Sequence, residues 1–234
     1  MTSPSEPDCM DILYVADRCV RRFVSAEVGT NMYVLTEGAH ALVVDPHLSG
    51  EALNFLGEND IEECTVFLTH EHPDHVWGLH ALQEAFRTVV VCQKACAGAI
   101  ADRENNRPTL ITAMLSVQDS RNGTNNAEAF LHRYEEHVYA ADVVFGHDLV
   151  RAWGRERFVF THTPGHSEGS CCILWNDAAV FTGDSLLRDV PVITRLPGGS
   201  TSRYRELTLP YLKALNRELL VLPGHGAEFR LKDI

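Results

Sequence analysis

The chain of 234 residues is 45% hydrophobic and 22% charged, an ordinary composition for a soluble globular protein with a sizeable core. Its formal net charge of -12 argues against nucleic acid as a partner, because nucleic-acid binding normally needs a basic face. No stretch reaches the roughly eighteen apolar residues of a membrane span, so we expect no membrane partner.

The N-terminus and the cysteines together predict a cytoplasmic protein. Met1–Asp8 is polar and acidic, unlike a secretory signal, and we expect this segment to fray. The seven cysteines are odd in number and scattered, with no CxxC pair. Reduced thiols explain this distribution better than a disulfide framework does.

Short strands are expected first, followed by alternating strands and helices. The pattern predicts an antiparallel meander of three strands at Ile12–Val24, Asn31–Leu35 and Ala41–Val44, and then a helix at Ser49–Gly57. A strand, a helix, a strand and a short helix are predicted next, at Thr65–Thr69, His75–Phe86, Val89–Cys92 and Lys94–Ala101. This β-α-β-α order favours a parallel or mixed sheet.

Residues of about 102–139 differ from what precedes them. Polar turn residues and amphipathic stretches predict a mostly helical insertion with a mobile turn at Asn122–Asn126. Two interpretations are open: a lid over a functional site, or decoration of the fold, which we favour.

The second half of the chain repeats the make-up of the first. Strands are predicted at Val143–Phe145, Val150–Trp153, Arg157–Thr161, Cys171–Trp175 and Ala179–Thr182, followed by a helix at Tyr204–Asn216 and a last strand at Leu219–Leu222. Two sheets packed face to face, each covered by helices outside, would bury these apolar runs.

The densest cluster of reactive side chains follows the strand at Thr65–Thr69. It contains His70, His72, Asp74 and His75, and neutral imidazole and ionised carboxylate are ligands for divalent metals. The period of two in an extended segment puts His70 and His72 on one side, while the other pair can face a second ion. The spacing does not fit a helical HExxH zinc motif. The alternative interpretation is a group of solvated loop histidines.

Four more candidate groups each stand where a predicted strand stops. They are Asp45, His166, Asp184 and His225, and the last three adjoin glycine while Asp45 precedes proline. Glycine permits the tight turns that can aim such side chains at a shared pocket. A single residue of this kind is more often an ordinary turn residue, but four at strand ends favour a common site.

These residues, taken in chain order, resemble the motifs of the metallo-β-lactamase superfamily of metal-dependent hydrolases. The resemblance covers nearly the whole chain, from about Ile12 to His225. It implies an α/β (α+β) fold, a four-layer αββα sandwich, in a single domain spanning residues 1–234. The metals are then expected at the rim between the two sheets.

The resemblance also implies the role of each ligand. By position, His70, His72 and His166 hold a first ion, Asp74, His75 and His225 hold a second, and Asp184 bridges both. Asp45 is expected to orient the ligands through hydrogen bonds. The implied cofactors are two divalent metal ions, with Zn²⁺ as the first choice and iron or manganese as alternatives.

A dinuclear hydrolase similar to hydroxyacylglutathione hydrolase is the implied activity. Two ions lower the pKa of a bridging water, and the resulting hydroxide attacks a thioester or ester carbonyl. Asp184 and Asp74 are the predicted catalytic carboxylates, with Asp74 accepting the released proton. Asp184 stands where the best-known zinc β-lactamases carry Cys, so antibiotic hydrolysis is not the first choice.

Other activities share this ligand set. A mononuclear iron persulfide dioxygenase, a lactonase and a phosphodiesterase are the alternatives, while a binding protein without turnover is disfavoured because no ligand position is lost. Hydroxyacylglutathione hydrolase also has a helical C-terminal domain that contributes to its glutathione site, whereas this chain ends at Ile234. The thiol carrier is therefore left open.

The loop after Asp184 suggests how a substrate is bound. Arg188 and Tyr204 are candidate substrate-binding residues for a small molecule with an anionic tail. The alternative is a solvated basic loop that balances an acidic surface.

Overall fold

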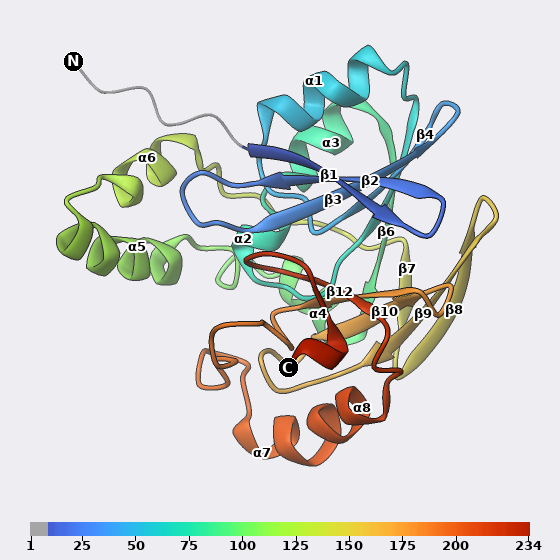
Figure 1. Cartoon of the computed structure of the whole chain (residues 1–234). Coiled ribbons are helices and arrows are strands. Elements are labelled where there is room, and N and C mark those ends of the chain that lie inside the picture. The colour runs from blue at the N-terminus through green and yellow to red at the C-terminus, as the bar shows by residue number, and fades with distance from the viewer. Residues whose placement is uncertain (1–8) are drawn as a thin grey trace.

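Two β-sheets face each other in the computed structural model, which describes residues 9–234 (Figure 1). The fraying expected for Met1–Asp8 lies outside the described residues. A seven-stranded sheet has the order β1-β2-β3-β4-β5-β6-β7, and a six-stranded sheet has the order β13-β12-β11-β10-β9-β8. The first comprises Cys9–Val15, Arg18–Val24, Asn31–Glu37, His40–Val44, Glu63–Phe67, Arg87–Gln93 and Val143–Phe145. The second comprises, from β8 to β13, Asp148–Trp153, Glu156–His162, Cys171–Trp175, Ala179–Gly183, Leu220–Pro223 and Phe229–Arg230.

Helices cover the outer faces of both sheets. Helices α1 (Gly50–Glu58) and α3 (Leu79–Ala85) lie on the outer face of the first sheet, and α8 (Leu209–Ala214) lies on that of the second (Figure 1). Helix α4 (Lys94–Ile100) also packs into the first outer layer, through Cys96 and Ile100. The expected αββα sandwich is thus confirmed.

Aromatic side chains fill the space between the sheets. Phe67 of the first sheet lies edge-on to Phe158 and Phe160 of the second, with ring centroids 5.2 and 4.8 Å apart. All three side chains are fully buried, and each burial stabilises the fold by roughly 1.5–3 kcal/mol. This core fixes the two sheets, and the loops at their ends, relative to each other.

Parallel pairing brings several loops to one rim of the sandwich. Strands β4, β5, β6 and β7 run parallel, as the β-α-β-α order predicted, and β11 runs parallel to β12. The carboxyl ends of parallel neighbours share an edge, so the segments that follow these strands lie close together. The loops after β4, β5, β11 and β12 carry all the predicted ligands except His166, which follows β9, a strand that runs in the same direction as β11.

Two predicted elements are divided in the structure. Ile12–Val24 is not one strand but parts of β1 and β2, which pair antiparallel with Val15 opposite Arg18. The turn between them contains Ala16, whose φ is 51°. The helix expected at His75–Phe86 is broken into α2 (Pro73–Val76) and α3. A Cβ on Gly78, between them, would lie 2.2 Å from the carbonyl oxygen of His47, so only glycine allows this close approach.

The C-terminal part also differs from expectation. The helix predicted at Tyr204–Asn216 begins earlier, as α7 (Thr201–Arg203), continues as a π-helical turn at Tyr204–Thr208 and ends with α8. The strand expected at Leu219–Leu222 is present as β12 (Leu220–Pro223), but it is not the last one, because β13 follows and pairs with it. No helix among the described residues is both long and apolar enough to cross a membrane.

The range 102–139 contains helices α5 (Thr109–Asn122) and α6 (Asn126–Arg133), which lie to one side of the sheets (Figure 1). Ile111 and Leu115 of α5 and Phe130 of α6 form an apolar cluster with Trp77. Trp77 directly follows α2, so this pair of helices packs against the segment that carries Asp74 and His75.

Candidate metal centre

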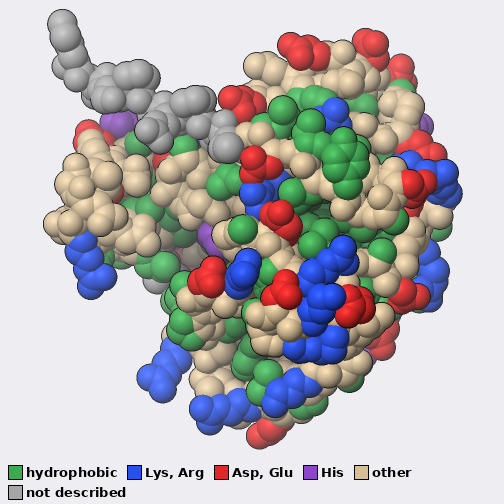
Figure 2. Space-filling view, in the orientation of Figure 1, with side chains coloured by type: hydrophobic (Ala, Val, Ile, Leu, Met, Phe, Trp, Pro, Cys, Tyr) green, Lys and Arg blue, Asp and Glu red, His purple; other side chains and the backbone are tan. Residues whose placement is uncertain are grey.

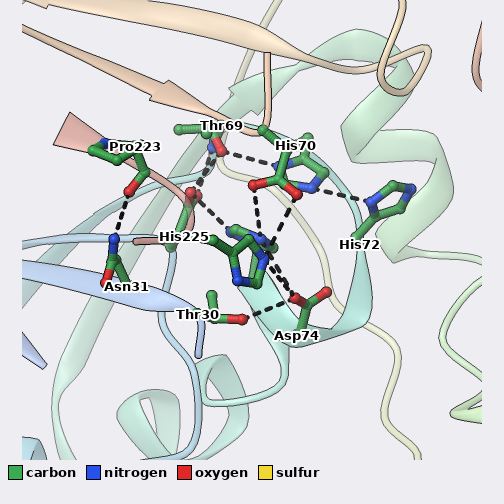
Figure 3. Close-up of polar contacts among 12 residues, drawn as sticks. Thr30, Asn31, Thr69, His70, His72, Asp74, Pro223 and His225 are labelled. Atoms are coloured by element: carbon green, nitrogen blue, oxygen red, sulfur yellow. Dashed lines mark hydrogen bonds and ion pairs between the residues drawn. The ribbon is translucent and has the colours of Figure 1, made fainter. Parts of the chain in front are cut away.

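Three imidazoles converge just beyond β5 and β9. His72 Nδ1 lies 3.1 Å from His70 Nε2 and 2.9 Å from His166 Nε2. Ligands at the usual zinc–nitrogen distance are about 3.3 Å apart in a tetrahedron, so these nitrogens are already close to the spacing of one face. His70 and His72 thus project to the same side, as expected (Figure 3). His166 comes from the other sheet, after β9.

In two of these rings, a hydrogen bond from Nδ1 directs the Nε2 atom toward the other imidazoles. His166 Nδ1 donates to the carbonyl oxygen of Ile193 at 2.8 Å, which leaves the lone pair on Nε2. His70 Nδ1 is 3.0 Å from Thr69 Oγ1, whose own hydroxyl donates to Asp45, so the ring donates to Thr69 (Figure 3). Such contacts fix the tautomer of a metal-binding histidine.

A second group lies beside the first and consists of Asp74, His75 and His225. Asp74 Oδ2 is 3.3 Å from His225 Nε2 and 3.5 Å from His75 Nε2. Thr30 Oγ1 donates to the same Asp74 oxygen at 2.8 Å (Figure 3). The three ligand atoms lie within 4.8 Å of one another, close enough to hold one ion.

Asp184 stands between the two groups. Its Oδ2 is 3.6 Å from His166 Nε2 of the first group and 3.6 Å from His225 Nε2 of the second. Its Oδ1 lies 3.7 Å from His75 Nε2, and both of these buried atoms have no hydrogen-bond partner. Buried polar atoms are rarely left unpaired, and a cation between the groups would satisfy both. The donor set therefore fits two metal ions.

Asp45 uses its carboxylate to orient its neighbours. It accepts hydrogen bonds from Thr69 N at 2.7 Å, Thr69 Oγ1 at 2.6 Å and His75 Nδ1 at 3.1 Å. This hydrogen bond orients the His75 ring so that its Nε2 atom points toward Asp184. Asp45 has a φ of 53°, a conformation that aspartate and asparagine adopt more readily than most residues.

Burial dominates the electrostatics of the first group. Burial, and then the neighbouring His166, lowers the pKa of His72 to about 4. The pKa of His70 lies well below its usual value for the same leading reason, with adjacent imidazoles adding to the effect. Both rings are therefore neutral, which is the form that binds metal.

Charge dominates the second group. Burial would raise the pKa of Asp74, but His75 and His225 outweigh it and hold that pKa far below its usual range. Burial would lower the pKa of His75, but the carboxylates of Asp74, Asp45 and Asp184 raise it to about 10. The same carboxylates that favour a proton on His75 would also attract a metal cation to this group.

The loop of His225 is held by a segment far away in the sequence. Asn31 Nδ2 donates to the carbonyl oxygens of Pro223 at 2.9 Å and Gly226 at 2.8 Å (Figure 3). A Cβ on Gly224 would lie 2.3 Å from Asp184 Oδ1, so glycine is needed where this loop meets the site. Neither Asn31 nor Thr30 has a sequence signal that links it to His225.

Glu71, between two predicted ligands, is a further organising residue. Its side chain is buried, accepts a hydrogen bond from Ser167 Oγ at 2.9 Å and accepts another from Gly169 N at 3.2 Å. Ser167 follows His166 directly, so this carboxylate joins the two loops of the first group. Its place in the motif was visible in the sequence, but its partners lie almost a hundred residues away.

A cavity of about 390 Å³ opens onto both groups, and His72, Asp74, His166, Asp184 and His225 line it. Arg188 and Tyr204, the residues expected to bind substrate, are not among the lining residues. Arg188 is half-exposed and pairs loosely with Asp189 at 4.0 Å, while the Tyr204 hydroxyl donates to the Ser185 carbonyl at 3.1 Å. Their role in substrate binding stays a prediction.

Known proteins resemble this chain over about half to nearly nine-tenths of its length. The model of the metallo-beta-lactamase superfamily matches residues 26–225. The probable metallo-hydrolase YqgX of Bacillus subtilis is 27% identical over 210 residues, covering 89% of this chain and 90% of that protein. Hydroxyacylglutathione hydrolase 1 of Vibrio vulnificus is 27% identical over 118 residues, which cover 49% of this chain and 47% of that protein.

Solved structures with the same arrangement were also found. The BLEG-1 B3 metallo-beta-lactamase is 24% identical with a TM-score of 0.70, covering 91% of this chain and 94% of that one. ETHE1 from Myxococcus xanthus is 25% identical with a TM-score of 0.66, covering 92% of this chain and 80% of that one. The first likeness shows the fold alone.

Proposed function

Since the chain belongs to the metallo-beta-lactamase superfamily, we propose that it is a dinuclear metal-dependent hydrolase that cleaves a thioester or ester. The observation that carries the proposal is the position of Asp184, within 3.7 Å of ligand atoms of both histidine groups. A carboxylate so placed can be shared by two cations.

The first ion is assigned to His70, His72 and His166, the second to Asp74, His75 and His225, and Asp184 is assigned to both. Zn²⁺ is proposed because imidazole and carboxylate together suit it, with iron or manganese as alternatives. Two such ions supply an activated water and polarise a carbonyl oxygen.

The residues of the chain determine how this chemistry is used. Asp45 and Ile193 hold the imidazoles of His75 and His166 with their Nε2 atoms toward Asp184. Asp74 lines the cavity, and we propose that its carboxylate would accept the proton released during hydrolysis. The aromatic core between the sheets keeps the loops of both sheets in place.

The substrate class is supported by likeness and by the cavity. The hydroxyacylglutathione hydrolase of Vibrio vulnificus matches about half of this chain, which favours a thioester or ester over other linkages. The cavity is large enough for a small molecule. A cytoplasmic location is proposed as well, because Cys19, Cys64, Cys92, Cys96, Cys171 and Cys172 all carry free thiols.

Metal analysis followed by a substrate panel tests the proposal. The purified protein should contain about two zinc ions per chain and hydrolyse members of a panel of thioesters, esters, lactones, phosphodiesters and β-lactams. A chelator should abolish the activity, and added Zn²⁺ should restore it. One iron per chain with oxygen uptake on glutathione persulfide would favour the dioxygenase instead.

A further inference from the structure

The cavity beside the metal centre has two unlike walls. One consists of the polar groups described above. The other is built from apolar side chains of α5 and of the segment 193–197, namely Ile111, Met114, Leu115, Ile193, Leu196 and Pro197. In Figure 2 a histidine is visible between the lobe of α5 and α6 on the left and the body of the molecule, with apolar side chains beside it.

The apolar wall is fixed to the body of the protein. Trp77 stacks on Phe130 of α6 with ring centroids 4.3 Å apart. Arg133, at the end of α6, pairs with the buried Glu27 and donates to the Leu48 carbonyl at 2.8 Å. Ile111 and Leu115 of α5 belong to the same cluster as Trp77 and Phe130, so these contacts also fix α5 beside the site.

The charges around the cavity do not favour an anionic tail. Among the described lining residues, Arg107 is the one Lys or Arg, and its Nη1 lies 2.7 Å from the carboxylate of Glu104. An anion would have to compete with that carboxylate on a protein whose formal net charge is -12. Apolar contacts, by contrast, are offered by both α5 and the segment opposite.

We propose that the substrate carries an uncharged, apolar acyl group, which lies between α5 and the segment 193–197 while its ester or thioester carbonyl faces the metal centre. This inference rests on the proposed hydrolase function and adds the class of acyl group to it. It differs from the anionic substrate that Arg188 and Tyr204 suggested, which stays a separate prediction. Met114, which is 41% exposed in the wall, is the side chain that most directly tests it.

A series of p-nitrophenyl esters provides the first measurement. From acetate to octanoate, kcat/KM of the metal-loaded protein should rise by up to about fourfold for each methylene that enters the cavity. An anionic ester such as the monosuccinate should be hydrolysed more slowly than the butyrate. A flat series, or a preference for the anionic ester, would overturn the inference.

A pair of variants on helix α5 provides the second measurement. Met114→Glu places a charge in the wall and should lower the ratio of octanoate to acetate hydrolysis at least about tenfold. Val117→Glu is the matched control, since Val117 is 53% exposed on the same helix but does not line the cavity. Ile193→Glu, on the facing segment and 47% exposed, should repeat the effect of Met114→Glu. Equal ratios in Met114→Glu and Val117→Glu would contradict the proposal.

Binding without turnover separates this inference from the proposed function. Titration calorimetry with octanamide on the chelator-treated protein should show binding that Met114→Glu weakens at least about tenfold and Val117→Glu leaves unchanged. If no ester is hydrolysed but this binding is found, the hydrolase function fails and the apolar site stands. If esters are hydrolysed but octanamide binds equally to both variants, the apolar site alone fails.

Discussion

The two walls of the cavity are held in place by different forces. On the metal side, buried polar atoms contact each other at hydrogen-bonding distance, and Asp45 alone accepts three such bonds. On the α5 side, the wall is held by apolar packing of Trp77 against Phe130 and Leu115. The polar wall depends on the position of single atoms, whereas the apolar wall depends on filled volume. We therefore expect that substitutions in one wall change reactivity and substitutions in the other change selectivity.

Removing the shared carboxylate should have the largest effect. Asp184→Asn keeps the size of the side chain but takes away its charge, so we expect more than about a hundredfold weaker binding of at least one ion, with matching loss of activity. Metal content by mass spectrometry and turnover are the measurements. Asp189→Asn, 88% exposed in the same loop, is the control. Full metal loading and wild-type turnover in Asp184→Asn would rule out the bridging role.

Asp45→Asn tests whether orientation alone matters on the polar wall. Asparagine tolerates the φ of 53° but has only one acceptor oxygen, so it cannot accept all three hydrogen bonds. Metal affinity, measured by competition with a chelator, should fall about 10–100-fold. Asp60→Asn is a matched control, because Asp60 has a φ of 52° in an exposed turn. Unchanged affinity would mean that Asp45 only supports the backbone.

Phe130→Ala tests the apolar wall in the same way. Loss of a fully buried ring should lower the free energy of unfolding by about 3 kcal/mol and reduce the preference for long acyl esters, while the metal content at saturating zinc stays the same. Urea denaturation and the ester series measure the two effects. Leu131→Ala, on the exposed side of α6, should change neither the free energy of unfolding nor the preference for long acyl esters. A loss of metal in Phe130→Ala would show that the two walls are not separable.

Arg188→Ala should have the smallest effect. Arg188 is half-exposed and does not line the cavity, so KM for apolar esters is expected to change less than about twofold. The same assay with an anionic thioester tests whether Arg188 binds an anionic tail, as expected from the sequence. A marked rise in KM for that substrate, with metal content unchanged, would restore Arg188 as a substrate-binding residue.

The polar wall was largely predictable from the sequence, and the apolar wall was not. Ligands such as His70 and Asp184 stand at strand ends, and parallel pairing brings strand ends together, so spacing and periodicity carry the information. Glu71 and Thr30 were missed because their partners are distant in the sequence. The break at Gly78 depends on the carbonyl of His47, and the position of Met114 at the cavity depends on how α5 packs on Trp77. Neither leaves a local pattern.

Each histidine group takes members from both halves of the sandwich. His70 and His72 follow the first sheet and His166 the second, and the other group divides likewise between His75 and His225. Neither half of the chain contains all the metal-ligand candidates of either group. If the backbone were cut in the connection before β7 and the pieces were expressed apart, zinc uptake would report their reassembly, so the ion could serve as a gauge of fragment complementation.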